Sequence, residues 1–191
     1  MLIHTDILRA ALCCVADESE ARKYLRGVNI TPTHIQACSG IAMVSMEHGD
    51  NTEIEGVFLF DGEIPDNADG TYINLFDDGW MAIHIDEFEH PVGSTNLTKI
   101  ECRYPDFSKL LPPEPESFNE LPMFSSSLLE LPFRMFGKSV VKFKPFGKTA
   151  PCQILLDPVV NEFFGNPFMV MMPLREDAFE QVAEVLNEEN L

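Results

Sequence analysis

The chain has 191 residues, of which 45% are hydrophobic, so it can bury a core in one or two domains. Its formal net charge of −18 excludes a broad basic surface of the kind that grips nucleic-acid phosphates. No apolar run approaches the roughly 20 residues of a membrane-spanning helix. The N-terminus also lacks the charged segment followed by an apolar segment that is typical of a signal peptide. The cysteines form no CxxC pair, so we expect free thiols in a cytoplasmic protein.

The first half of the chain has the pattern of a β-rich domain with one helix. Residues 1–4 are predicted as a short strand, and apolar residues at helical spacing predict a helix over residues 5–16, capped by Thr5 or Asp6. Because residues that favour turns separate the later apolar runs, we expect an antiparallel meander. Its strands are predicted over residues 22–31, 34–47 with a bend at 39–40, 54–60, 72–75 and 80–85.

A stiff connector, residues 103–115 (RYPDFSKLLPPEP), joins the two halves of the chain. Its prolines favour extended backbone. The apolar residues between them, Phe107, Leu110 and Leu111, indicate that the connector docks on a folded surface.

The second half is predicted to contain two helices and three strands. Residues 125–136 favour a helix, which either starts near Leu131 or is short or kinked at Pro132, because an interior proline removes a backbone hydrogen bond. Strands are predicted over residues 140–146, 152–156 and 167–172, and an acidic amphipathic helix over residues 175–190.

Motifs for catalysis are weak throughout. The run Gly147-Lys148-Thr149 lacks the leading glycine of a phosphate loop, because Lys142 stands in that position. His84, Asp86 and His90 could share one strand face, but their spacing matches no metal motif. We therefore expect no enzyme activity, no cofactor and no metal site.

Three separated segments carry a resemblance to a known family. They are residues 21–46 (ARKYLRGVNITPTHIQACSGIAMVSM), 103–112 (RYPDFSKLLP) and 170–175 (VMMPLR). In this order they resemble the bacterial sliding clamp, the β subunit of the replicative DNA polymerase. That family has a Y-L-x-G strand, an A-T-D-G-H-R-like strand, an F-P-D-Y-x-x-x-L-P connector and a V-M-P-M-R-like last strand.

The resemblance implies an α+β sliding-clamp fold, with antiparallel sheets and a few helices packed on one face. Residues 1–113 would form a clamp-like domain similar to the family's middle domain. Residues 114–191 would form part of a clamp-like domain similar to the last domain, followed by the acidic C-terminal helix.

The resemblance also implies a hydrophobic pocket that binds short peptides of polymerases and clamp loaders. Leucine, isoleucine, methionine and proline suit such a trough, and methionine adapts to varied partners. The residues that correspond to the family's pocket are Leu25, Cys38, Gly40, Ile41, Met43, Pro105, Leu110, Val170, Met172, Pro173, Leu174 and Arg175.

The chain departs from the family in ways that bear on function. Residues 37–42 read ACSGIA instead of A-T-D-G-H-R, so the peptide preference should shift toward apolar contacts. The helices that would face DNA offer only Arg9, Arg134 and Lys138, so we expect weak DNA binding without sequence specificity. Residues 72–76, YINLF, loosely resemble the leucine-phenylalanine ending of clamp-binding peptides, but alternating apolar residues in a strand explain them better.

The sequence therefore predicts a sliding-clamp-like DNA replication accessory protein that binds polymerase or clamp-loader peptides. Chains of this length would close a homo-oligomeric ring of about three copies, which would encircle DNA and confer processivity. The alternative is a clamp-like interaction module that does not encircle DNA, or a clamp antagonist that competes for clamp-binding partners.

Overall fold

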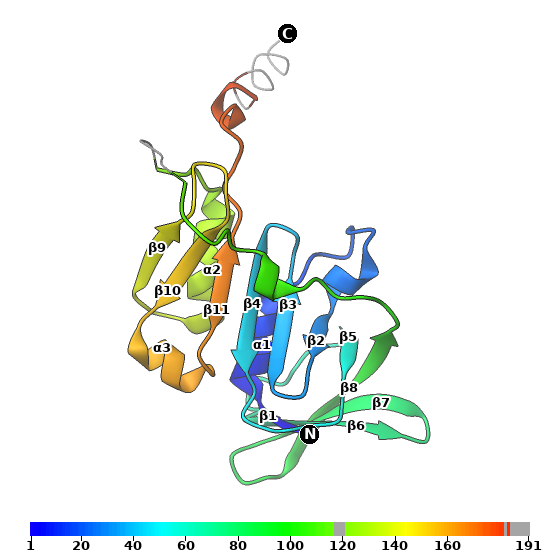
Figure 1. Cartoon of the computed structure of the whole chain (residues 1–191). Helices are drawn as coiled ribbons and strands as arrows, with labels where there is room; N and C mark the ends of the chain where they lie inside the picture. The colour runs from blue at the N-terminus through cyan, green and yellow to red at the C-terminus, as the bar shows by residue number, and fades with distance from the viewer. Residues whose placement is uncertain (117–120, 182, 184–191) are drawn as a thin grey trace.

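One antiparallel sheet runs through the whole molecule (Figure 1). The computed structural model describes residues 1–116, 121–181 and 183. The sheet has 11 strands in the order β1-β6-β7-β8-β5-β2-β3-β4-β11-β10-β9, so β1 and β9 lie at its two edges. The strands are β1 (Leu2–His4), β2 (Val28–Ile30), β3 (His34–Cys38), β4 (Ala42–Glu47), β5 (Gly56–Asp61), β6 (Gly70–Phe76), β7 (Gly79–Ile85), β8 (Pro91–Ile100), β9 (Val141–Pro145), β10 (Cys152–Leu156) and β11 (Phe168–Met171).

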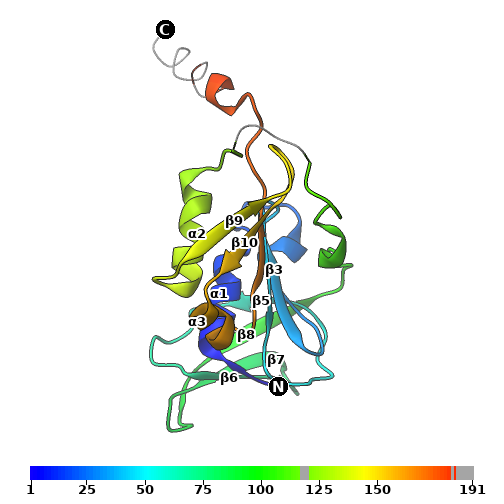
Figure 2. The same ribbon diagram turned by 60° about the vertical axis from the view of Figure 1, so that its left-hand side comes forward.

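The two longer helices, α1 (Thr5–Cys13) and α2 (Ser126–Phe136), pack against each other on one face of the sheet. A third helix, α3 (Pro158–Phe163), connects β10 to β11, and two 3₁₀ turns, η1 (Lys23–Arg26) and η2 (Phe107–Lys109), complete the fold. Figure 2 shows α2 and η2 on opposite sides of the sheet. The predicted α+β arrangement, with antiparallel strands and helices on one face, is confirmed. In the described part of the chain, no helix combines the length and apolarity needed to cross a membrane.

The ends of the helices follow from a few side chains. At the start of α1 the His4 imidazole accepts a hydrogen bond from the Asp6 N–H, so His4 is the cap and not the predicted Thr5 or Asp6. Ser125 caps α2 by accepting from the Leu128 N–H. The helix then continues through Pro132, whose side chain is buried, so it begins at Ser126 and not near Leu131.

Several other predictions of local structure were wrong. Residues 23–26, predicted as strand, form the 3₁₀ turn η1. The predicted bend at residues 39–40 is confirmed, since it separates β3 from β4. Strand β8 was missed because only Thr95 and Leu97 of its side chains are buried, which leaves no apolar alternation to detect. Residues 178–181 and 183 are helical, whereas the rest of the acidic helix predicted to reach residue 190 lies outside the described residues.

The pairing of β4 with β11 joins the two halves of the chain into one sheet. Met43 stands opposite Val170, and Phe168 stands opposite Ser45. Gly165, which precedes β11, has a φ of 63°, and its carbonyl oxygen accepts a hydrogen bond from the Glu47 N–H at 2.7 Å. A Cβ at Gly165 would overlap the Glu47 carbonyl oxygen, so only glycine allows this close approach.

A buried polar network ties α1 to the strands beneath it. His84 is fully buried, with Nδ1 3.0 Å from Thr71 Oγ1 and Nε2 2.8 Å from Thr95 Oγ1. Thr71 Oγ1 also lies 2.8 Å from Thr5 Oγ1. Burial, with a smaller contribution from the positive charge of Arg9, lowers the pKa of His84 below its ordinary 6.5. Folding therefore disfavours the protonated form of this imidazole.

Acidification is expected to destabilise the protein through His84. Below pH 6.5 the unfolded chain protonates this residue more readily than the folded chain, so the free energy of unfolding falls as the pH decreases. Urea unfolding on either side of that pH measures the effect, and the loss should be smaller in a His84→Gln variant, which cannot titrate. Equal pH dependence in both proteins would contradict this assignment.

Candidate functional site

Three side chains from neighbouring strands form an apolar row on the sheet face opposite α1 and α2. The register pairs Cys38 of β3 with Met43 of β4, and Met43 with Val170 of β11. Met43 and Val170 are both buried. Because side chains alternate across a strand, the row points away from the main core, which contains Ala42, Val44 and Met169. The pairing of β4 with β11 thus builds a second, smaller apolar cluster.

The predicted docking of the connector occurs on this row. Phe107 of η2 is buried against Met43 and Val170, with Tyr104, Leu110 and Leu111 packed around them. The rings of Tyr104 and Phe107 lie 5.7 Å apart between centroids. The connector is therefore part of the folded structure at this point.

A pocket opens beside Leu110, and all three residues of the row line it. Its volume is about 180 Å³, below the roughly 300–1,000 Å³ of typical small-molecule sites, so it suits one or two side chains of a partner. Ile41 and Met172 form the rim, with 55% and 37% of their surface exposed. The Met172 N–H donates to the Ile41 carbonyl at 2.8 Å and fixes the two rim residues together. The lining residues are Cys38, Gly40, Ile41, Ala42, Met43, Leu110, Pro151, Val170 and Met172.

The structure brings together a majority of the residues predicted for this site. Those that line the pocket are Cys38, Gly40, Ile41, Met43, Leu110, Val170 and Met172. Ala42 and Pro151 were missed, the first because it belongs to the main core and the second because it comes from the loop between β9 and β10, which carries no sequence signal.

The remaining predicted residues lie around the pocket without lining it. Leu25 of η1 is buried beneath the β3–β4 turn, where a Cβ on Gly40 would come 3.8 Å from its Cδ1 atom. Pro105 is half-buried in the connector, upstream of Phe107. After β11 the chain leaves the pocket through Pro173, Leu174 and Arg175, and the Leu174 N–H donates to the Met123 carbonyl.

The polar groups near the pocket are kept neutral by burial. Burial raises the pKa of the Cys38 thiol, against smaller lowering effects from the Gly40 N–H and the Arg22 charge. Burial also raises the pKa of Tyr104, whose hydroxyl has no hydrogen-bond partner among the described residues. The pocket therefore offers a partner apolar contact and little charge.

The predicted DNA-facing residues differ in their exposure to solvent and in their hydrogen bonds. The Arg9 guanidinium donates to Asp6 at 2.9 Å and to the backbone carbonyls of Pro65, Asp66 and Ala68, so it fastens α1 to the loop before β6. Arg134 and Lys138, at the C-terminal end of α2, have exposed side chains. Of the three predicted residues, these two are the exposed ones.

Of the weak metal candidates, Asp86 and His90 lie together in the turn after β7, with His90 Nδ1 3.6 Å from an Asp86 carboxylate oxygen. His84 is separate from them, enclosed by the hydroxyls of Thr71 and Thr95. Over residues 1–116, 121–181 and 183 no three His, Cys, Asp or Glu side chains cluster as metal ligands would.

Comparison with known proteins shows which fold this chain has. No family model matches the sequence, and no curated protein matches it. Solved structures do match, at low sequence identity. The DNA polymerase sliding clamp of Bacillus subtilis superposes with a TM-score of 0.60 at 11% identity, over 92% of this chain and 64% of the clamp.

Two further solved structures also superpose on this chain. A protein assigned as a DNA polymerase III beta subunit from Eubacterium rectale gives a TM-score of 0.57 at 11% identity, over 93% of this chain and 66% of that one. The DNA polymerase III beta chain of Streptococcus pneumoniae gives 0.51 at 11% identity, over 92% and 64%. The chain therefore has the sliding-clamp fold and spans 64–66% of the length of these structures.

Replacing Tyr104 with phenylalanine is expected to stabilise the protein. The buried hydroxyl has no partner among the described residues, and removing it should raise the free energy of unfolding by about 1 kcal/mol. Urea unfolding measures the change, and Tyr72→Phe, at an exposed hydroxyl, should leave stability unchanged. A destabilised Tyr104→Phe variant would mean that the hydroxyl is hydrogen-bonded after all.

Proposed function

We propose that this protein is a non-enzymatic, sliding-clamp-like accessory protein of DNA replication. In this role it binds short peptide motifs of a polymerase or clamp loader in the pocket beside Leu110. The observation that carries the proposal is the composition of that pocket. Residues from β3, β4, β11 and the connector, far apart in the sequence, converge on one small apolar cavity in a fold shared with sliding clamps.

The physical properties of the pocket favour a peptide over a metabolite. The cavity has room for one or two side chains, its walls are aliphatic and sulfur-containing, and its charged neighbours are few. A peptide that inserts a leucine or an aromatic residue would bury it against Met43 and Val170, with Met172 and Ile41 closing over it. A few buried anchors of this kind carry most of the energy of peptide complexes.

We further propose that the division at residue 113 separates two clamp-like units and that about three copies close a ring around DNA. The DNA contact is then weak, because Arg134 and Lys138 are the two predicted DNA-facing residues left free in a chain of net charge −18. The alternative is a module that does not encircle DNA, or an antagonist that competes with clamps for their partners. The scarcity of basic residues on the helices favours this alternative.

Peptide binding tests the pocket directly. Met172→Asp, at the exposed rim, is expected to weaken a fluorescent clamp-binding peptide at least tenfold, or about 1.4 kcal/mol, because it places a charge where an apolar anchor enters. Fluorescence anisotropy of the titrated peptide gives the affinity. Phe88→Asp is the matched control, since Phe88 is an exposed apolar residue in the turn after β7.

The control should bind like the unchanged protein. If the unchanged protein binds no clamp-binding peptide, or if Met172→Asp and Ile41→Asp both bind as tightly as the control, the proposed role of the pocket is wrong.

The salt dependence of DNA binding tests the basic residues. With Arg134 and Lys138 as the phosphate contacts of each subunit, log K against log salt concentration should have a slope of about −2 per subunit. Replacing both with glutamine should bring the slope close to zero, whereas replacing Lys142 alone should change it less. Tight binding to linear duplex DNA with a steep slope would contradict the weak contact proposed here.

A further inference from the structure

The chain continues beyond β11 in a short segment that carries an exposed aromatic side chain. Residues 176–181, called the tail segment, project from the body of the molecule (Figure 1). Local hydrogen bonds hold their turn, among them one from the Gln181 N–H to the Asp177 carbonyl at 3.0 Å. Phe179 of this turn is 77% exposed. A single exposed apolar residue is ordinary on a protein surface, so its meaning depends on what lies within its reach.

The tail segment begins at the rim of the pocket proposed for peptides. Met172 lines that pocket, and Phe179 follows seven residues later. Glu176 forms an ion pair with Lys148 in the loop between β9 and β10, at 3.5 Å, and Pro151 of the same loop lines the pocket. Seven extended residues span at most about 25 Å, so a bend in this stretch returns Phe179 to the rim.

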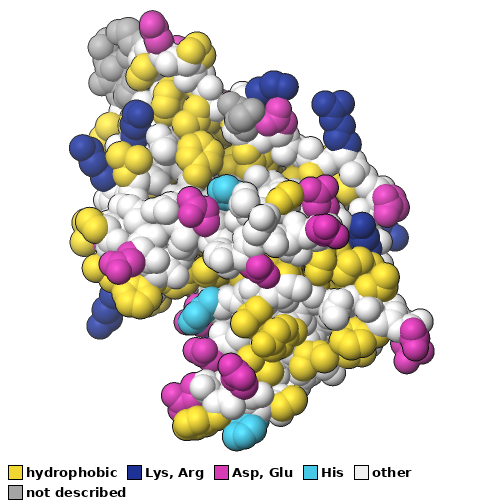
Figure 3. All heavy atoms as spheres, turned by 60° about the horizontal axis from the view of Figure 1, so that its bottom comes forward, with side chains coloured by type: hydrophobic (Ala, Val, Ile, Leu, Met, Phe, Trp, Pro, Cys, Tyr) yellow, Lys and Arg dark blue, Asp and Glu magenta, His cyan; other side chains and the backbone are white. Residues whose placement is uncertain are grey.

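Two other apolar surfaces suit the tail segment less well. The first is the turn between β6 and β7, where Leu75 and Phe76 are exposed. The exposed carboxylates of Asp77 and Asp78 follow at once. Figure 3 views this end of the molecule, where hydrophobic side chains gather with acidic ones around them. Because like charges repel, this surface disfavours a tail segment that is itself acidic.

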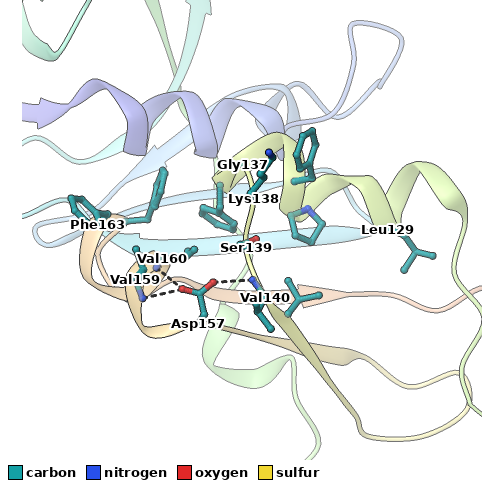
Figure 4. A pocket seen from close by; sticks show the side chains of 14 residues that line it. Leu129, Gly137, Lys138, Ser139, Val140, Asp157, Val159, Val160 and Phe163 are labelled. Carbon is teal, nitrogen blue, oxygen red and sulfur yellow. Dashed lines mark hydrogen bonds between the residues drawn. The ribbon is translucent and has the colours of Figure 1, made fainter.

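The second surface is a groove between α2, α3 and the start of β9 (Figure 4). Its volume is about 800 Å³, and Phe133 and Phe163 are exposed on its walls. The groove lies at the end of the sheet where α3 connects β10 to β11. The tail segment leaves from the other end of β11, where Met171 stands opposite Cys152. Of the three surfaces, the pocket is therefore the one at which the tail segment begins.

The pocket also has a suitable size and lining for the side chain of Phe179. Its volume of about 180 Å³ admits one or two side chains, and Met43 and Val170 form part of its wall. The Arg22 guanidinium, which lies beside the pocket, is already paired with Glu20 at 2.9 Å. Apolar burial, and not charge, would therefore hold a side chain in this cavity.

We propose that the tail segment folds back and places Phe179 in the pocket, where it competes with the peptides of partner proteins. This contact would regulate the proposed peptide site, and so it rests on the proposed function. A segment tethered this closely meets the pocket at an effective concentration of about 1 mM. A contact with a dissociation constant of about 1 mM would then fill the pocket about half of the time and weaken partner peptides about twofold.

Alkylation of Cys38 tests the contact without any peptide. Cys38 lines the pocket, so Phe179 in the pocket shields its thiol from iodoacetamide. Phe179→Asp is expected to raise the rate of Cys38 alkylation about twofold or more, measured by mass spectrometry of the digested protein. Cys102, which is exposed and does not line the pocket, should keep its rate and serves as the internal control. Phe179 is exposed, so the variant should fold, and circular dichroism verifies this.

Gln181→Asp is the matched control variant. It adds the same charge two residues further along the helical turn, on another face, and should react like the unchanged protein. Equal alkylation rates of Cys38 in Phe179→Asp and in the unchanged protein would overturn the contact, and so would an equal rise in Gln181→Asp.

The peptide titration separates the contact from the function of the pocket. Phe179→Asp should bind the fluorescent clamp-binding peptide about twofold more tightly or better, because no tail has to be displaced. Faster alkylation of Cys38 with an unchanged peptide affinity would overturn the competition. If Cys38 reacts faster in Phe179→Asp but neither protein binds the peptide, the contact stands and the proposed function of the pocket is wrong.

Discussion

The pairing of β4 with β11 is the interaction on which the other features depend. It joins strands from the two halves of the chain into one sheet and sets Met43 opposite Val170. That register places the apolar row on the face where the connector docks, and the same row lines the pocket. The residue just before β11 must be glycine, because Gly165 approaches the Glu47 backbone so closely that no side chain would fit there.

The sequence was informative where the pattern was local. Apolar periodicity located α1 and most strands, and the proline-rich connector with its buried Phe107 was recognised as a docking segment. Of the pocket residues, Cys38, Met43 and Val170 were found through resemblance to sliding clamps, since nothing in their own spacing shows that they meet. Their proximity is a property of strand register across the sheet, which depends on pairing between distant segments.

Other features escaped prediction for identifiable reasons. Strand β8 buries little of its surface, so its sequence is polar and shows no period of two. The 3₁₀ turn η1 places a buried Leu25 among exposed basic residues, a pattern that also fits a strand. Helix α3 did carry a local signal, since Asp157 caps it and Pro158 opens its first turn, but it is too short to show helical periodicity.

The distance along the chain between β4 and β11 has a consequence for synthesis. Strand β4 can pair with β3 as soon as both have been made, but its other side has no partner until β11 has been translated. Until then the nascent chain exposes an apolar strand edge, the kind of surface on which unfolded chains associate. Contacts this distant in sequence also form slowly. The nascent chain is therefore more prone to association than the finished fold, in which β4 is paired on both sides.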